Sequence, residues 1–135
     1  MCLITKWKKP KVAKKDIICF KIMRRIEDTI TSPFKFFEYE LDKLYKTEMT
    51  EDPTGGSYDE KDGKELIKYI EKGIPFIIIG EGFHAALTIQ RLGCIGFDYV
   101  YKCIIPKNSL YYQDATGLIV ANQIIIKEEV FEWYD

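Results

Sequence analysis

The sequence is poor in histidine, and its cysteines are not clustered. Its only histidine is His84, and its four cysteines contain no C-x-x-C pair. A structural zinc site needs four cysteine or histidine ligands, usually in closely spaced pairs, so we expect no metal site. Scattered thiols without a pairing pattern are typical of proteins from reducing compartments. We therefore predict free cysteines, no bound cofactor and a cytoplasmic location.

Long hydrophobic runs are also lacking. No uninterrupted apolar segment approaches the roughly 18 residues that suggest a membrane-spanning helix. No apolar region follows the N-terminus in the manner of a secretory signal peptide. The sequence thus predicts neither membrane insertion nor secretion.

An excess of charge of one sign is absent as well. Twenty lysines and arginines balance 21 aspartates and glutamates, for a formal net charge of -1, so no global field favours nucleic acid or an anionic membrane. One local exception is the run of six lysines between Lys6 and Lys15, which surrounds Trp7 and precedes the first acidic residue, Asp16. Such an arm is able to bind phosphates while its indole stacks on a base. The alternative is a solvated leader that binds nothing.

The length and composition predict a single domain covering residues 1–135. A chain of 135 residues with 47% hydrophobic residues is able to bury one core. Within it we expect a basic leader over residues 1–15. Residues 48–63, which contain Pro53 and the pair Gly55-Gly56, are expected to form a flexible surface loop.

Hydrophobic periodicity predicts an α+β fold with a mixed, mainly antiparallel sheet of about five strands and two short helices. Alternating or continuous β-branched segments predict strands at residues 16–24, 41–46, 76–79, 99–105 and 118–126. A helix over residues 64–72 is indicated by Leu66, Ile67 and Ile70 on one face, with Asp62 as its cap. A second helix over residues 84–92 is indicated by apolar residues at helical spacing, and Gly93 ends it. Residues 3–4 are expected to begin a packed strand.

Five segments resemble a small uncharacterised domain family of bacteriophage and prophage proteins, which in some members stands beside pentapeptide repeats. They are DIICFK at 16–21, FEYELDKLY at 37–45, GFH at 82–84, CIIPKNS at 103–109 followed by YY at 111–112, and NQIII at 122–126. The family has glycine where Asp42 and Asn108 stand here. Asp and Asn are the other residues that best tolerate left-handed backbone, so we expect that conformation at both positions. The resemblance implies a bacterial host cell and no assigned reaction.

Candidate catalytic residues are His84, Arg24 and Glu128. His84 titrates near neutrality and follows a glycine-rich turn, so it is a candidate general base, although a structural histidine is the alternative. The order of elements also resembles that of ADP-ribosyltransferases, with an early arginine and a late glutamate. This resemblance implies Arg24 or Arg25, Thr88 or Ser109, and Glu128 or Glu129 as the functional positions. The Ser-Thr-Ser motif of that family is absent, and the late glutamates form no Glu-x-Glu pair.

A group of tyrosines is the other candidate site. Tyr99, Tyr101, Tyr111 and Tyr112 would offer a stacking or protein-binding surface, unless the alternation along each strand places some of them in the core. We predict a non-catalytic binding or interaction module of phage or mobile-element origin. Its expected partner is a protein, and nucleic acid is expected only through the lysine arm. The alternative is a small nucleotide-using enzyme with a fold remotely like that of ADP-ribosyltransferases.

Overall fold

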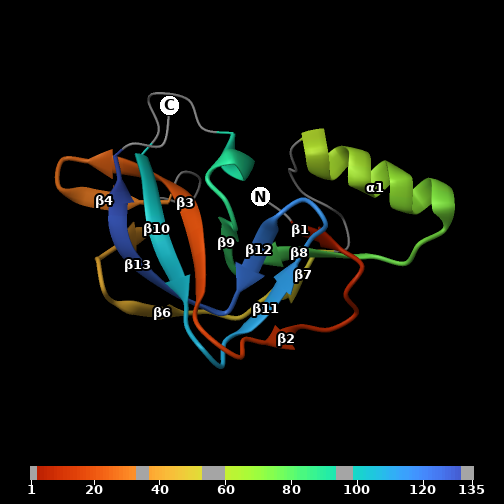
Figure 1. Ribbon diagram of the computed structural model, residues 1–135, viewed down its shortest axis with the longest axis horizontal. Coiled ribbons are helices and arrows are strands. Elements are labelled where there is room, and N and C mark those ends of the chain that lie inside the picture. The colour runs from red at the N-terminus through yellow and green to blue at the C-terminus, as the bar shows by residue number, and fades with distance from the viewer. Residues whose placement is uncertain (1–2, 33–36, 53–59, 94–98, 132–135) are drawn as a thin grey trace.

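The protein is mainly β rather than α+β. The computed structural model describes residues 3–32, 37–52, 60–93 and 99–131. Of these described residues, 50% are in strands and 14% in helices, so the predicted fold of about five strands and two short helices is wrong. In the described residues, thirteen strands form a sheet of three and a sheet of ten, accompanied by one α-helix and one short 3-10 turn (Figure 1).

Every strand pairing described is antiparallel. The smaller sheet has the order β1-β8-β7. The larger runs β2-β11-β12-β9-β3-β10-β13-β6, with β4 paired to β3 and β5 paired to β4. The strands are β1 (Leu3–Thr5), β2 (Lys11–Val12), β3 (Ile17–Ile26), β4 (Thr29–Thr31), β5 (Glu38–Tyr39), β6 (Leu44–Lys46), β7 (Thr50–Glu51), β8 (Ile77–Glu81), β9 (Phe83–Ala86), β10 (Tyr99–Ile105), β11 (Leu110–Gln113), β12 (Leu118–Ala121) and β13 (Gln123–Val130).

Each segment predicted as a strand overlaps at least one observed strand. The strand predicted at residues 99–105 is β10 with the same bounds, and those at 16–24 and 76–79 correspond to β3 and β8. The segment at 41–46 is a strand only over the three residues of β6. The strands without a predicted counterpart are two to four residues long, which is too short for a periodic pattern to reveal them.

The segment predicted as one strand over residues 118–126 is two strands that meet at Asn122. Strand β12 pairs with β9 and β11, whereas β13 pairs with β10 and β6. The Asn122 side chain accepts a hydrogen bond from the Leu110 amide at 2.9 Å, and its main-chain carbonyl accepts one from Thr47 at 2.9 Å. Asn122 therefore fixes the corner where the chain changes strand neighbours.

The helix predicted over residues 84–92 does not form. Residues 83–86 are strand β9, which pairs with β12 along its whole length, and only Gln90–Leu92 form a 3-10 turn, η1. The small residues Ala85 and Ala86 are 5% and 0% exposed, because the strand is covered on both faces. Gly93 does end the turn in a left-handed conformation, with φ 65°.

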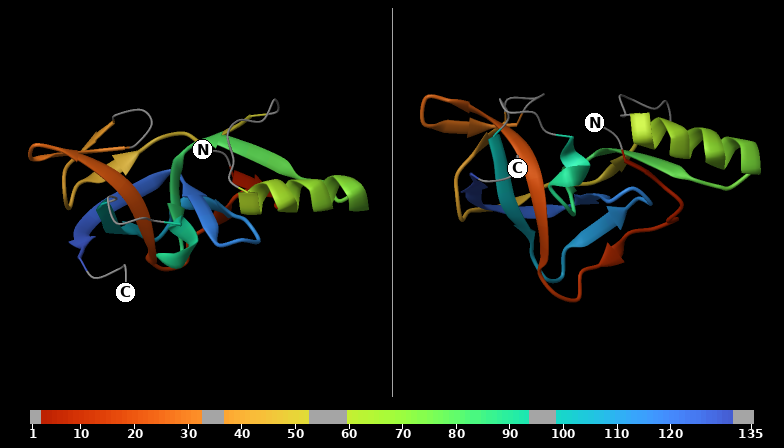
Figure 2. Two further views of the ribbon diagram at one scale, coloured as in Figure 1. Left: turned by 90° about the horizontal axis from the view of Figure 1, so that it is seen from above. Right: turned by 45° about the horizontal axis from the view of Figure 1, so that its top comes forward.

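Helix α1 (Glu60–Lys72) confirms the first predicted helix and begins four residues earlier than expected. Asp62 and Tyr69 are its buried residues, whereas Ile67 and Ile70 are 56% and 63% exposed. The predicted apolar face therefore does not pack on the sheet. Asp62 lies inside the first turn rather than at the cap, and the buried Asp62 and Tyr69 set the rotation of the helix about its axis. In Figure 2, α1 lies at the periphery of the molecule.

The N-terminal segment belongs to the fold instead of preceding it as a leader. Strand β1 is fully buried beside β8, and Ala13 is 1% exposed between β2 and the turn after β10. The predicted loop over residues 48–63 is likewise only partly a loop. Strand β7 lies near its start and the first turn of α1 at its end, while residues 53–59 lie outside the described part of the chain.

Strand β12 separates two hydrophobic clusters. Ile119 and Ala121 face the larger cluster with residues of β3, β10 and β13, whereas Leu118 and Val120 face a smaller one with residues of β1, β8 and β11. All four residues of β12 are buried, which explains the continuous apolar sequence of this strand.

Asp42 and Asn108 confirm the left-handed conformation expected from the sequence. Their φ angles are 61° and 76°. In this conformation the Cβ atom approaches the following carbonyl oxygen, and short polar side chains offset that cost better than others do. The agreement concerns the backbone at these two turns and leaves the family resemblance itself a prediction.

Replacing Gly82 with alanine is expected to lower the free energy of unfolding by about 3 kcal/mol, from steric overlap and backbone strain combined. Gly82 has φ 140°, and a Cβ there would lie 2.5 Å from Val120 Cγ2 and 3.1 Å from Met49 Cγ. Gly73 is the matched control, because its φ is 65° but a Cβ would meet nothing within 4 Å. Gly73→Ala should cost only about 1 kcal/mol. Equal losses for the two variants in urea denaturation would contradict the assigned overlap.

Candidate functional site

His84 lies in β9, with both ring nitrogens beside main-chain carbonyls. Nδ1 is 3.1 Å from the Gly82 oxygen and Nε2 is 3.3 Å from the Ile79 oxygen. Burial, and next the ammonium of Lys21, lower the pKa of His84 to about 4. At neutral pH the imidazole therefore carries one N–H and donates to one of these carbonyls. The imidazole therefore stabilises the turn between β8 and β9.

Lys21 bridges β3 and β9 where their backbones separate. These two strands pair at Phe20 and Ala86, and the Lys21 ammonium donates to the main-chain oxygen of His84. Burial lowers the pKa of Lys21 below its usual value. The lysine thus replaces a backbone hydrogen bond between the strands.

Two of the four cysteines face each other across the pairing of β3 with β10. Cys19 and Cys103 are direct cross-strand neighbours, both are fully buried, and both are free thiols as predicted. The hydrogen bond between them, followed by burial, raises the pKa of Cys19 well above its usual value, which disfavours a reactive thiolate. Cys2 and Cys94 lie outside the described residues.

The structure does not bring Arg24 and Glu128 together, but it joins their neighbours. Arg24 is exposed on β3, and Glu128 on β13 pairs with Lys102 at 3.8 Å. Arg25 instead contacts Glu129, with Nη1 3.3 Å from Oε1. The enzyme alternative thus stays a prediction, and its arginine and glutamate would be Arg25 and Glu129.

The four tyrosines lie on two different strands, two on β10 and two on β11. Tyr101 donates to Glu129 at 3.2 Å, and burial followed by this carboxylate raises its pKa to about 12. Tyr99 on the same strand lies beneath the Arg25 guanidinium, 5.9 Å from the ring centre. Tyr112 is buried in the smaller hydrophobic cluster, whereas Tyr111 packs against Trp7. One common stacking surface is not formed.

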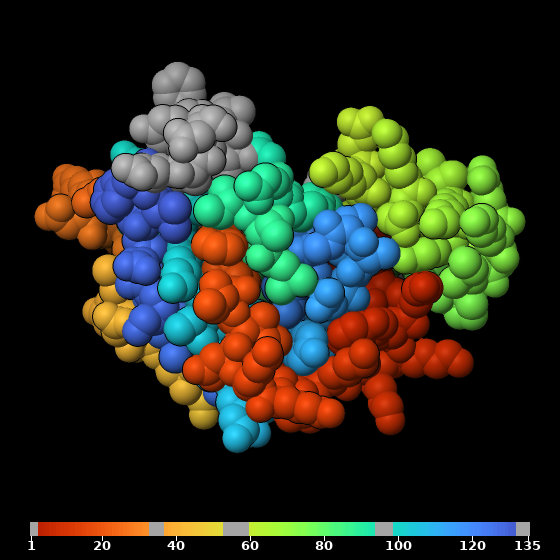
Figure 3. Space-filling view, viewed as in Figure 1, coloured from red at the N-terminus to blue at the C-terminus, as the bar shows by residue number. Residues whose placement is uncertain are grey.

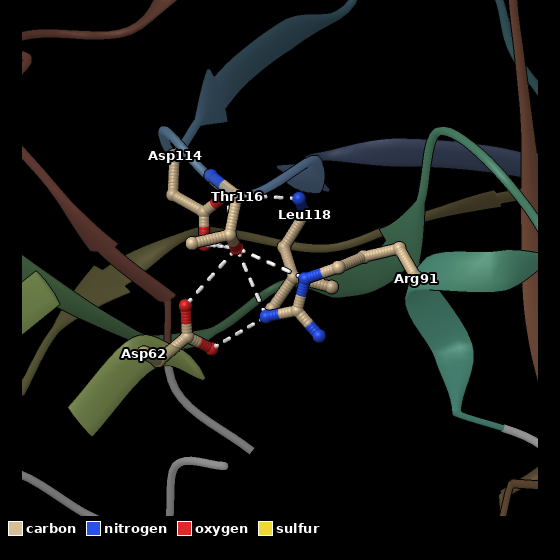
Figure 4. Close-up of polar contacts among 5 residues, drawn as sticks. All are labelled: Asp62, Arg91, Asp114, Thr116 and Leu118. Atoms are coloured by element: carbon tan, nitrogen blue, oxygen red, sulfur yellow. Dashed lines mark hydrogen bonds and ion pairs between the residues drawn. The ribbon is translucent and has the colours of Figure 1, made fainter. Parts of the chain in front are cut away.

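A buried polar network, which the sequence did not predict, joins α1, η1 and the turn between β11 and β12 (Figure 4). Arg91 on η1 lies 3.3 Å from the Asp62 carboxylate on α1, and their side chains are 6% and 1% exposed. Arg91 Nε and Nη2 both donate to the Thr116 hydroxyl, at 3.0 and 2.9 Å. The network connects three elements distant in sequence.

Asp114 completes this network by shaping the turn that holds Thr116. Its Oδ1 accepts hydrogen bonds from the amides of Thr116 and Leu118, at 2.8 and 2.9 Å. The Asp-x-Thr-Gly sequence of this turn could have predicted the turn, because an aspartate side chain commonly accepts a hydrogen bond from the amide of the residue two positions later. No sequence pattern predicts the ion pair between Arg91 and Asp62. Among the described residues, no three histidines, cysteines or carboxylates gather as metal ligands.

The lysine arm is an ordered, exposed edge of the molecule, here called the basic edge and defined as residues 6–15. Its first anchor is Thr5, whose hydroxyl donates to the Gln113 carbonyl at 2.8 Å and accepts from the Trp7 amide at 3.1 Å. Its second anchor is Ala13, whose amide donates to the Ser109 carbonyl at 2.8 Å. All six lysines between Thr5 and Asp16 are exposed. In Figure 3 the side chains of this red segment extend from the lower edge of the molecule.

Trp7 gives the basic edge an aromatic centre. Its ring packs edge-on against Tyr111 with 5.6 Å between the ring centres. The Lys11 ammonium lies over the indole, 4.1 Å from its centre, in a cation–π contact. Strand β2, which carries Lys11, pairs with β11 and is the last strand of the large sheet. The backbone pairing of Lys11 with Tyr111 therefore holds Trp7, Tyr111 and Lys11 together, and the other lysines of the basic edge are exposed nearby in the sequence.

Comparison with protein-family models, with curated proteins and with solved structures finds no match to this chain. The resemblance to phage-associated proteins therefore stays a prediction, and function is argued from the described surfaces. No helix in the described part of the chain has the length and apolar character needed to cross a membrane.

Proposed function

We propose that this protein is a non-catalytic binding module whose basic edge binds single-stranded nucleic acid. The observation that carries the proposal is the combination of six exposed lysines with an indole held among them. Lysines attract the phosphates without regard to sequence, and an aromatic ring stacks on any base. The cytoplasm of a bacterial host, suggested by the phage resemblance and by two free thiols, is the proposed location.

The contact between Lys11 and Trp7 indicates how the strand would bind. In the free protein the ammonium covers one face of the indole at 4.1 Å. A base stacking on that face would displace the ammonium, which then lies within reach of the adjacent phosphate. The exchange keeps the positive charge close to the strand, because the anchors at Thr5 and Ala13 hold the backbone on both sides. This mode favours a single strand, whose bases are accessible.

Replacing Lys6, Lys8 and Lys9 together with glutamine is expected to weaken binding of a fluorescent single-stranded oligonucleotide. Each lost phosphate contact reduces the slope of log affinity against log salt by about 0.7, so the triple variant should lose about 2 units of slope. Fluorescence anisotropy over a salt series measures both quantities. Trp7→Leu should weaken binding about tenfold and leave the slope unchanged, because stacking is lost while the charges remain.

The matched control removes three lysines at the opposite end of the strand order. Lys46, Lys102 and Lys127 lie on β6, β10 and β13, and their replacement by glutamine changes the net charge equally. Lysines beside an edge strand also discourage that strand from pairing with another chain. If this were their only role, the triple variant would aggregate and the wild type would bind no oligonucleotide. The assignment to nucleic acid would be overturned if the control variant bound the oligonucleotide as weakly as the triple variant of the basic edge. It would also be overturned if the wild type bound polyglutamate as tightly as the oligonucleotide and Trp7→Leu did not change the affinity for polyglutamate.

A further inference from the structure

Helix α1 presents an apolar stripe to solvent. Gly63, Ile67 and Ile70 recur at helical spacing on one face of the helix, which ends at Lys72. The two isoleucines are 56% and 63% exposed, more than most large apolar side chains in the protein. The helix is attached to the body by another face, where Tyr69 is 3% exposed and its ring stacks on Phe76. The stripe thus has no covering element among the described residues.

Charged residues of opposite sign lie beside the stripe, so this surface on one copy of the protein is complementary to the same surface on a second copy. Lys64 and Glu71 flank the stripe on the same side, one turn before Ile67 and one residue after Ile70, and both are exposed. In an antiparallel pair of helices related by a two-fold axis, residues before the midpoint of one helix face residues after the midpoint of the other. Lys64 of one copy then faces Glu71 of the other, twice in the pair.

We propose that α1 is a self-association surface, through which two copies of this chain pair with Ile67 of one copy against Ile70 of the other. A two-fold interface needs one patch that fits its own copy, and this stripe meets that need in both its apolar and its charged positions. The helix stands at one end of the molecule, so the antiparallel arrangement keeps the two bodies on opposite ends of the helix pair (Figures 1 and 2). This inference is independent of the basic edge.

The size of the stripe determines the strength of the pair. A helix of 13 residues is about 20 Å long, and a contact of that length buries less than the roughly 1,200 Å² of a standard stable interface. The dimer is therefore weak and forms reversibly as the protein concentration rises. Sedimentation equilibrium over a concentration series is the appropriate measurement.

Charge exchange tests the pairing directly. Lys64→Glu alone and Glu71→Lys alone each place like charges opposite one another, and each variant should remain monomeric where the wild type dimerises. An equimolar mixture of the two variants should dimerise again, because the carboxylate introduced at position 64 of the first then faces the ammonium introduced at position 71 of the second. Lys68→Glu reverses a charge on the same helix away from the stripe, and it should dimerise like the wild type.

Four results would overturn the proposal. The first is a wild type that stays monomeric up to about 1 mM, beyond the range of any specific interface. The second is a mixture of the charge variants that stays monomeric, and the third is loss of dimer in Lys68→Glu. The fourth is a wild type that is monomeric in solution but binds phosphatidylserine vesicles through Ile70, since an amphipathic helix with flanking lysines also suits a lipid surface.

Discussion

Replacing Arg91 with methionine is expected to lower the free energy of unfolding by about 3 kcal/mol, within the range measured for breaking buried ion pairs. The variant takes the guanidinium away from the Asp62 carboxylate at 3.3 Å and from the Thr116 hydroxyl at 2.9 Å. Asp62 is 1% exposed, so water cannot replace the lost contact without opening the structure. Chemical denaturation of wild type and variant measures the loss.

Two further variants distinguish the buried ion pair from a general effect of mutation. The double variant Asp62→Leu/Arg91→Met removes both charges and should be more stable than Arg91→Met alone, because an apolar pair needs no counter-charge. Lys102→Gln breaks the pair with Glu128, which is 3.8 Å long and lies at the surface, and should cost less than about 1 kcal/mol. A double variant less stable than the single one would show that the ion pair is not the main cause.

The network around Arg91 also explains the position of α1. Asp62 lies in the first turn of the helix, where the N-terminal end of the helix dipole favours a carboxylate. The pair with Arg91 and the hydrogen bond from Thr116 at 3.3 Å bring this turn onto the β11–β12 turn. With Asp62 and Tyr69 facing the body, Ile67 and Ile70 necessarily face away. The exposure of the apolar stripe is thus a consequence of the buried polar contact.

The elements predicted correctly are those with a strong local pattern. The alternation over residues 99–105 predicts β10, and the helical spacing before Gly73 predicts α1. The left-handed turns at Asp42 and Asn108 follow from the chemistry of single residues. In each case the information lies within a few residues of the feature. Local pattern is therefore sufficient where one segment determines its own conformation.

The wrong predictions concern segments whose structure is decided by distant partners. Ala86, Ile89 and Leu92 have helical spacing, yet Ala86 is in β9 because it pairs with Leu118 on β12. The apolar run that contains Val120 continues past Asn122, where β13 begins to pair with different strands. Pairings over thirty or more residues outweigh local propensity in such segments. The count of strands and the fold class were wrong for this reason.

The candidate site was partly predictable. The run of lysines around Trp7 is visible in the sequence, and the structure shows it as an anchored edge. The contact of Trp7 with Tyr111 was not predictable, because it depends on β2 pairing with a strand almost one hundred residues later. The pair of Arg91 with Asp62 had no local signal either, since an arginine in a turn and an aspartate in a helix are ordinary surface residues.

His84 is the residue whose interpretation changes most. The sequence suggests a general base at the start of a helix, whereas the structure holds the imidazole between two main-chain carbonyls in β9. Protonation would allow both nitrogens to donate, but burial and the nearby Lys21 ammonium oppose the second charge more strongly. The pKa of His84 is therefore about 4 in the folded protein, below its ordinary value of 6.5. At neutral pH the ring is a poor proton acceptor.

Acidification from pH 7 to pH 5 is expected to lower the free energy of unfolding by about 2 kcal/mol, because His84 takes up a proton in the unfolded chain but not in the folded protein. A folded-state pKa below the unfolded value means that stability is complete above about pH 6.5 and is lost as the pH falls towards 4. As His84 is the only histidine, few other groups titrate in this window. Urea denaturation at pH 7, 6 and 5 measures the loss.

The control variant His84→Gln keeps one amide donor for the carbonyls, and its free energy of unfolding should show no such dependence on pH over the same range. Equal slopes for wild type and variant would mean that the buried imidazole is not the titrating group.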